Sequence, residues 1–168
     1  MLTSVRRALP AVLLALAAAL PVAAQQKRGI DPSIDIRSVQ GALSWPVEGK
    51  VFEKFGRQRN PKFATFTVNN GLKIEAVPGT QVRAVFQGTV LFSQWFKGYG
   101  NLIILKHDNN LLTAYAHNKT LLVKEGEPVT KGQKIAEAGQ SDSDRPKLHF
   151  EVRKQGKPVD PMDYLPAR

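Results

Sequence analysis

Apolar and polar residues alternate with a period of two over most of residues 41–168. Val82, Ala84 and Phe86, for example, alternate with Gln81, Arg83 and Gln87 before Gly88 turns the chain. A period of two places successive side chains on opposite faces of a β-strand. The region lacks a convincing stretch with the apolar spacing of an amphipathic helix. The pattern therefore predicts strands rather than helices.

Turn-forming residues separate the predicted strands. Residues 102–105 are a continuous apolar run, which is typical of a strand buried on both faces. Residues 107–110 are predicted to be a turn with a solvated histidine, and residues 111–116 the returning strand of a hairpin. Two further turns, at residues 125–128 and 131–133, flank a short strand. Short strands with frequent turns predict an all-β, antiparallel domain that is two-layered or barrel-like.

The segment 148–153 alternates strictly, so its three apolar side chains are expected on one face of a strand. Its histidine and two charged side chains are expected on the other face. By the same spacing, Tyr115 and His117 are expected to share a face. A polar strand face is most often simply solvated, so periodicity alone leaves the role of these histidines open.

The start of the chain is predicted to be a targeting segment. Two arginines precede the mainly apolar residues 8–20, and small side chains follow up to Ala24. The apolar run is shorter than the roughly 20 residues that span a bilayer. We therefore predict a signal peptide over residues 1–24, cleaved after Ala24. Residues 25–40 are too polar to build a core and are predicted to be a flexible linker, followed by one domain over residues 41–168.

The chain contains no cysteine, which excludes disulfides and a lipid-modified cysteine on the given sequence. We therefore expect a soluble periplasmic protein that is not a lipoprotein and has no membrane anchor. The formal net charge is +10. In an exported protein this charge favours peptidoglycan carboxylates, anionic lipid head groups or an acidic protein surface as partners, and not nucleic acid.

Short motifs spread over the domain resemble, in order and spacing, the lysostaphin/LytM family of zinc metallopeptidases, which cut peptidoglycan cross-links. The resemblance covers nearly all of residues 41–165 and implies the β domain of that family. The motifs are Trp45–Gly49, Phe55–Gly56, Gly71–Ile74, Pro78–Ala84, Gly98–Asn101, Tyr115–Asn118, Val129–Gln133 and Leu148–Arg153.

Active members of this family bind zinc through a His-x-x-x-Asp segment and the last histidine of a His-x-His strand, and two more histidines assist the metal-bound water. The resemblance places Asn69 and Lys73 at the first pair of positions, Lys147 and His149 at the second, and His117 at one assisting position. An amide is a poor zinc ligand, and a lysine ammonium has no lone pair to donate. Since a catalytic zinc needs about three protein ligands, the resemblance implies a chain that is not an enzyme and holds no cofactor.

The C-terminal segment 147–166, together with residues 100–104, resembles the NlpD-like group of murein hydrolase activators, to which the EnvC-like activators are related. The resemblance implies that the partner is a periplasmic N-acetylmuramoyl-L-alanine amidase, with peptidoglycan as a further candidate. Binding is expected to draw an autoinhibitory helix away from the amidase zinc during cell-wall remodelling and daughter-cell separation. The lipoprotein cysteine and LysM domain of NlpD-like proteins, and the coiled coil of EnvC-like proteins, are not found in this sequence.

The same resemblance implies a partner-binding groove. Tyrosine and arginine are the residue types that most often anchor interfaces, although Tyr99, in a Gly-Tyr-Gly turn, is equally consistent with a packing role. The implied lining is Asn69, Lys73, Tyr99, Tyr115, His117, Lys147, His149 and Arg153.

Two other functions are consistent with the sequence. The first is an active zinc peptidoglycan endopeptidase with noncanonical ligands such as His107, which metal analysis would test. The second is a periplasmic wall-binding or adaptor module, because residues 123–133 resemble the hairpin of lipoyl and biotinyl carrier domains and of periplasmic adaptors. Carrier domains need a lysine at a tight turn within a motif that is not found here.

Overall fold

A computed structural model describes residues 41–60, 62–107, 110–140 and 145–168. The predicted signal peptide and linker lie outside these residues, so that division of the chain stays a prediction. In the described residues no helix has the length and apolar character needed to cross a membrane. The elements are β1 (Val51–Glu53), β2 (Gly56–Arg59), β3 (Phe66–Asn69), β4 (Leu72–Glu75), β5 (Gln81–Arg83), β6 (Gly88–Phe96), β7 (Gly100–Lys106), β8 (Leu111–Leu121), β9 (Pro128–Val129), β10 (Lys134–Ala138), β11 (Lys147–Lys154), β12 (Lys157–Val159) and the short 3-10 helix η2 (Pro161–Asp163).

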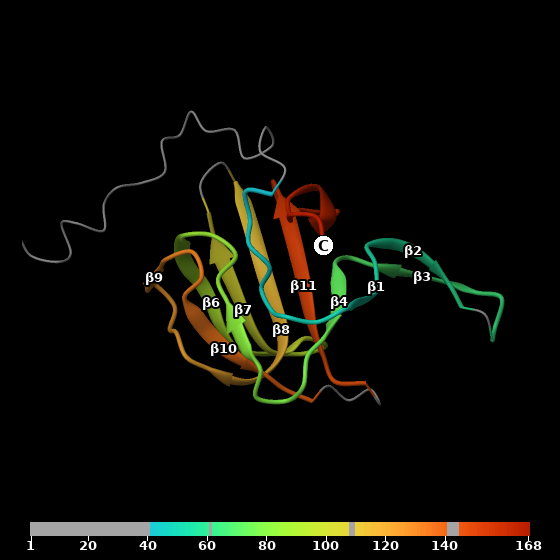
Figure 1. The fold of residues 1–168 in the computed structure, drawn as a ribbon, viewed down its shortest axis with the longest axis horizontal. Helices are drawn as coiled ribbons and strands as arrows, with labels where there is room; N and C mark the ends of the chain where they lie inside the picture. The colour runs from blue at the N-terminus through green and yellow to red at the C-terminus, as the bar shows by residue number, and fades with distance from the viewer. Residues whose placement is uncertain (1–40, 61, 108–109, 141–144) are drawn as a thin grey trace, which may run out of the picture.

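The strands pair antiparallel, which confirms the predicted all-β class. Most belong to one sheet with the order β1-β4-β11-β8-β7-β6-β9, while β12 pairs with β11. The end of the long strand β8 also pairs with β10, which in turn pairs with β5. β2 and β3 form a separate two-stranded sheet that projects from the body of the domain (Figure 1).

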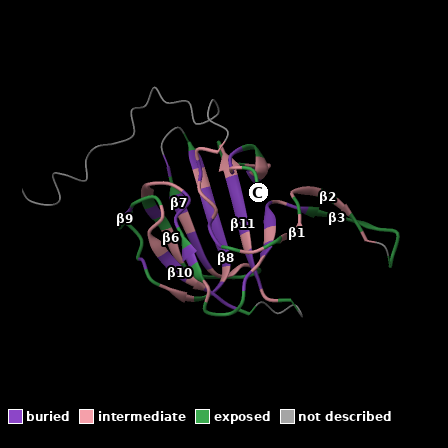
Figure 2. Cartoon of the chain, viewed as in Figure 1, coloured by how far each residue is buried: buried purple, intermediate pink, exposed green. Residues whose placement is uncertain are grey.

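The main core lies on one face of the central strands and also contains residues of β5 and β10, which belong to the same sheet. Buried residues run along β7, β8 and β11 (Figure 2). Leu148, Phe150 and Val152 have no exposed surface, which confirms the alternation predicted for this strand. A second, smaller apolar cluster includes Ala114 and Ala116. It lies on the opposite face, because the cross-strand partners of these alanines are Glu151 and His149 rather than the apolar residues of β11.

A β-bulge in β8 changes which side chains face the core. Asn101 pairs with Asn118 and Ile103 with Tyr115, so one residue of β7 opposes both Ala116 and His117. His117 has a positive φ of 65°, which turns its side chain to the face of Ala116. The expectation that Tyr115 and His117 share a face is therefore wrong, because the extra residue resets the alternation between them.

His107 is buried, not solvated as expected, with only 2% of its surface exposed. Its Nδ1 lies 2.7 Å from the carbonyl oxygen of Gln87, and its Nε2 lies 2.8 Å from Oγ1 of Thr113. The prediction was wrong because His107 directly follows β7 and continues its alternation, so that its ring points toward the core, where both ring nitrogens have partners. Residues 108–109 of the predicted turn lie outside the described residues.

Candidate functional site: a groove opposite the core

A groove of about 430 Å³ lies on the face of β8 and β11 that is turned away from the core. Five residues implied by the sequence resemblance meet here, although they come from β3, β4, β8, β11 and the turn after β6. The lining is Glu53, Thr67, Val68, Asn69, Asn70, Lys73, Gly98, Tyr99, His117, His149 and Glu151.

Glu151 organises the centre of the groove, although only 1% of it is exposed. Its carboxylate accepts hydrogen bonds from Nε2 of His149 at 2.8 Å, from the Tyr99 hydroxyl at 3.1 Å and from Nε of Arg153 at 2.7 Å. Burial alone would raise the pKa of Glu151, but the hydrogen bonds and charges of His149 and Arg153 outweigh it and hold this pKa below its usual value. Since the carboxylate is ionised, Nε2 of His149 carries the hydrogen. Sequence reasoning placed Glu151 on the polar face but missed this role.

The Glu151 carboxylate also shifts the pKa values of Tyr99 and Arg153. Burial and the negative charge of Glu151 raise the pKa of Tyr99, so its hydroxyl keeps its proton and donates it to the carboxylate. Burial opposes the charge of Arg153, but the ion pair with Glu151 outweighs burial and raises the pKa of this guanidinium. Hydrogen bonds to Glu151 therefore hold Tyr99 and Arg153 in one arrangement before any partner binds.

Lys73 lies beside this cluster, directly opposite His149 on the neighbouring strand. Its Nζ is 2.7 Å from both carboxylate oxygens of Glu53. Lys147, which is 7% exposed, has a lowered pKa, first because of burial and then because of the positive charge of Lys73. Asn69 is tied to the backbone, since its Nδ2 donates to the carbonyl oxygen of Lys54 at 2.9 Å.

These residues do not fit a zinc ion. The rings of His117 and His149 lie 6.3 Å apart between centroids, and Lys73 stands beside them as a cation paired with Glu53. In the described part of the chain, no group of three or more histidine, cysteine, aspartate or glutamate side chains could hold a metal ion. A zinc site needs about three protein ligands, and nearby ammonium groups repel a dication. That Asn69 and Lys73 occupy former ligand positions stays a prediction.

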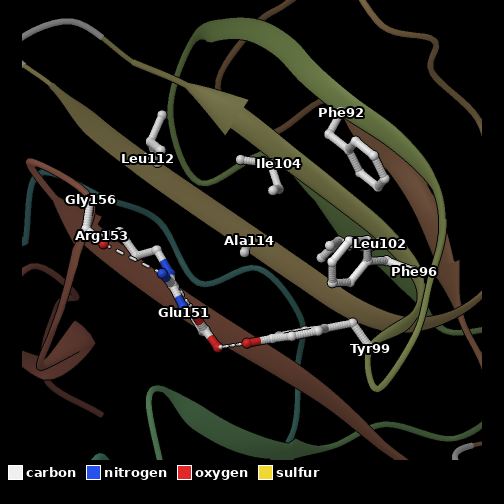
Figure 3. Close-up of a pocket in the computed structure, with 10 residues that line it drawn as sticks. All are labelled: Phe92, Phe96, Tyr99, Leu102, Ile104, Leu112, Ala114, Glu151, Arg153 and Gly156. Atoms are coloured by element: carbon white, nitrogen blue, oxygen red, sulfur yellow. Dashed lines mark hydrogen bonds and ion pairs between the residues drawn. The ribbon is translucent and has the colours of Figure 1, made fainter.

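The groove continues into an apolar pocket of about 350 Å³, shown in Figure 3. Tyr99, Glu151 and Arg153 form its polar rim and are linked by hydrogen bonds. The rest of the pocket is almost wholly apolar, and its residues come from β6, β7 and β8 and from the turn between β11 and β12. The lining is Phe92, Phe96, Tyr99, Leu102, Ile104, Leu112, Ala114, Glu151, Arg153 and Gly156.

Sequence reasoning missed this apolar half. The run at residues 102–105 is apolar on both faces, but only one face meets the core, and Leu102 and Ile104 line the pocket instead. A second bulge contributes: Val90 pairs with Leu105 and Phe92 with Ile104, so the extra residue between them turns Phe92 into the pocket. The sequence did contain a signal, because residues 102–105 are apolar on both faces of the strand. The core covers only one of these faces, so the other face was available to line a pocket.

Tyr115 does not line the groove, so its assignment there is wrong. It is fully buried, and its ring packs against Phe150 with centroids 5.4 Å apart. Its hydroxyl accepts from the backbone N–H of Val85 at 3.1 Å and lies 3.0 Å from the Thr113 hydroxyl. Burial raises its pKa. Of the other implied residues, five line the groove, whereas Lys147 and Arg153 do not. Lys147 is buried near Lys73, and Arg153 lies at the rim of the apolar pocket.

The family model for peptidase family M23 matches residues 67–161. The chain belongs to this family, as the sequence resemblance predicted.

Three curated relatives support the assignment. "Lipoprotein NlpD/LppB homolog" from Pseudomonas aeruginosa is 43% identical over 129 residues, which are 76% of this chain and 41% of the relative. "Murein hydrolase activator NlpD" from Escherichia coli is 44% identical over 125 residues, 74% of this chain and 31% of the relative. "Murein hydrolase activator EnvC" from Escherichia coli is 35% identical over 127 residues, 75% and 29% of the two chains. The chain thus spans less than half the length of these relatives.

Solved structures show the same fold. A zinc-containing peptidase from Vibrio cholerae has a TM-score of 0.67 and 30% identity, covering 73% of this chain and 40% of the other. The catalytic domain of lysostaphin from Staphylococcus simulans has a TM-score of 0.62 and 26% identity, covering 70% and 92%.

The expectation that the chain is not a lipoprotein and lacks a membrane anchor is wrong. Relatives at 40–43% identity are named as lipoproteins, including the Pseudomonas aeruginosa protein. The expectation depended on the absence of cysteine from the sequence. One missing residue type does not determine how proteins that carry this β domain are attached to a membrane.

Proposed function

We propose that the protein is a non-catalytic, periplasmic activator of a zinc-dependent N-acetylmuramoyl-L-alanine amidase. It would thereby promote peptidoglycan cleavage during cell-wall remodelling and daughter-cell separation. Relatives of the same family with 35–44% identity are named murein hydrolase activators, which supports the activation of a peptidoglycan hydrolase. The choice of an amidase as the partner is the finer part of the proposal.

One observation carries the proposal: the groove is suited to binding but not to metal chemistry. Its charges are already compensated, since Lys73 is paired with Glu53 and Glu151 with Arg153. A ligand therefore does not have to neutralise a buried charge on entering, which would be costly. Next to this compensated centre lies an open apolar pocket in which Phe96 is still 50% exposed. Covering such a surface is favourable because apolar area leaves water.

The pocket favours a protein segment as its ligand. Its volume of about 350 Å³ is enough for a few apolar side chains, and its lining is apolar except at the rim. At the rim the Arg153 side chain is 32% exposed and already positioned by Glu151. It can donate a hydrogen bond to a carbonyl or carboxylate of the bound segment. The sequence of such a segment would combine spaced apolar residues with an acceptor group.

Binding would activate the amidase by shifting its conformational equilibrium. If the groove binds a segment only when that segment has left the amidase active site, the open amidase gains the free energy of binding and the closed amidase does not. A preference of about 3 kcal/mol would raise the open population roughly a hundredfold while the open form remains rare.

The direct test is release of dye from labelled, purified murein by a periplasmic amidase of the same cell. We expect the protein alone to release no dye and to increase release when the amidase is present. Phe96→Ala should weaken activation, because truncating an aromatic interface residue commonly costs about 2 kcal/mol, or roughly thirtyfold in affinity. Leu122→Ala is the matched control, since Leu122 is similarly exposed, at 45%, but does not line the groove.

Circular dichroism and thermal melting must first show that both variants fold. If the protein stimulates the amidase no more than an unrelated basic protein does, the proposed function is wrong. If Phe96→Ala and Leu122→Ala activate equally well, the function can stand but the pocket is not where the amidase binds.

A further inference from the structure

The β2–β3 hairpin is a projecting element that the groove accounts for only in part, since Thr67, Val68 and Asn69 border the groove and the rest of the hairpin does not. Its two strands pair with each other and, within the described residues, with no other strand. Figure 1 shows the hairpin extending away from the body of the domain beside β1 and β4. Most of its length is therefore open to solvent on more than one side.

The register divides the hairpin into two chemically different faces. Gln58 pairs with Thr67, and Gly56 pairs with Asn69, which is buried at the groove. The intervening pairs are Arg57 with Val68 and Arg59 with Phe66. Cross-strand partners point to the same face and successive pairs alternate. The amide and hydroxyl side chains thus belong to the groove-side face, and arginines paired with apolar residues form what we term the outer face.

The apolar residues of the hairpin are unusually exposed. Val68, which pairs with Arg57 and also borders the groove, is 73% exposed. Phe66 is 52% exposed, and Phe63 at the tip is 72% exposed. The guanidinium carbon of Arg57 lies 3.7 Å from the centroid of the Phe66 ring, so the charge and the aromatic ring form one surface. A projecting element that exposes several large apolar side chains is typical of an interaction site.

The charge of this hairpin has a single sign. Residues 54–69 contain the cations Lys54, Arg57, Arg59 and Lys62, and no aspartate or glutamate. None of the ion pairs formed among the described residues involves these four side chains. A partner suited to this hairpin is therefore anionic and also accepts apolar side chains.

We propose that the tip and outer face of the β2–β3 hairpin bind the surface of a bilayer that contains anionic lipids. Phenylalanine and valine would enter the boundary between head groups and acyl chains, and the arginine and lysine side chains would pair with lipid phosphates. This combination of apolar and cationic groups is what interfacial binding requires. The inference does not depend on the proposed activation of an amidase.

The shape and chemistry of the hairpin favour a bilayer over the wall polymer. A convex projection can enter an extended surface, whereas a glycan or peptide strand is usually held in a hollow. Neutral amide and hydroxyl side chains are well suited to hydrogen bonding with the hydroxyl groups of a sugar. Gln58, Thr67 and Asn69, which have such groups, belong to the other face.

The test is partitioning of the full chain onto sedimented vesicles, either of phosphatidylcholine alone or of equal parts phosphatidylcholine and phosphatidylglycerol. Arg57→Gln/Arg59→Gln should lower partitioning to anionic vesicles about thirtyfold at low salt. Phe63→Ser should lower it about tenfold. The matched controls, Lys106→Gln/Lys124→Gln and Leu122→Ser, remove exposed cations or an exposed apolar side chain elsewhere and should change little.

All variants retain the same N-terminal segment, so differences between them measure the hairpin alone. The substituted side chains are exposed, and thermal melting will verify that each variant folds. Equal partitioning of hairpin variants and controls would overturn the inference. So would equal hairpin-dependent binding to neutral and anionic vesicles, or a loss of binding that appears only with purified peptidoglycan sacculi.

Discussion

Replacing Glu151 with glutamine tests whether the buried carboxylate organises the groove. Glutamine keeps the shape of the side chain but removes the negative charge and one acceptor oxygen. Hydrogen bonds to a charged group contribute about 1.5–3 kcal/mol each, and three such bonds converge on this carboxylate. The loss is smaller than their sum because glutamine still accepts through one oxygen and because Arg153, 32% exposed, can turn to water. We expect Glu151→Gln to lower the free energy of unfolding by about 2 kcal/mol at neutral pH.

The stability that Glu151 contributes should also depend on pH. The pKa of Glu151 is lower in the folded chain than in the unfolded chain. Its stabilising contribution is therefore complete above the ordinary carboxyl pKa of about 4.3 and is lost as the pH falls through the lower, folded-state value. The difference in stability between the parent protein and Glu151→Gln should be largest at neutral pH and should shrink as the solution becomes acidic.

Urea unfolding followed by tryptophan fluorescence, repeated from neutral to acidic pH, measures both effects. Glu125→Gln is the matched control, because Glu125 is exposed in a turn and its substitution should leave stability almost unchanged. The reasoning is refuted if Glu151→Gln is as stable as the parent at neutral pH. It is also refuted if the stability difference between the two proteins does not change with pH.

Three other outcomes are expected. Tyr115→Phe should cost about 1–2 kcal/mol in urea unfolding, because it leaves the Val85 N–H without its acceptor, yet the folded variant should still activate the amidase. Gly71→Ala should cost about 3 kcal/mol or prevent folding, which thermal melting would show, because the added Cβ would clash with the carbonyl oxygen of Phe150. Protein purified without chelators should contain far less than one zinc per chain by elemental analysis; about one zinc, lost on His149→Ala, would contradict the account of the groove.

The sequence by itself determined the strand content, the antiparallel class, the family and the inward face of β11. These depend on local alternation and on motif order, and Leu148, Phe150 and Val152 are buried as the period of two requires. The order of the motifs also predicted that five residues would meet in one groove, because motifs shared with a family occupy the same positions in its fold. These residues are Asn69, Lys73, Tyr99, His117 and His149.

Only the tertiary structure decided which side chains turn away from that pattern. The bulge at Ala116 and His117 turns His117 to the groove while Tyr115 stays in the core, and a second bulge turns Phe92 into the apolar pocket. A bulge depends on pairing with a neighbouring strand, so alternation within one strand cannot reveal it. The partners of Glu151 come from residues as far away as Tyr99, and those of His107 from both sides of it in the sequence. Such contacts are set by the packing of the sheet, which no single segment specifies.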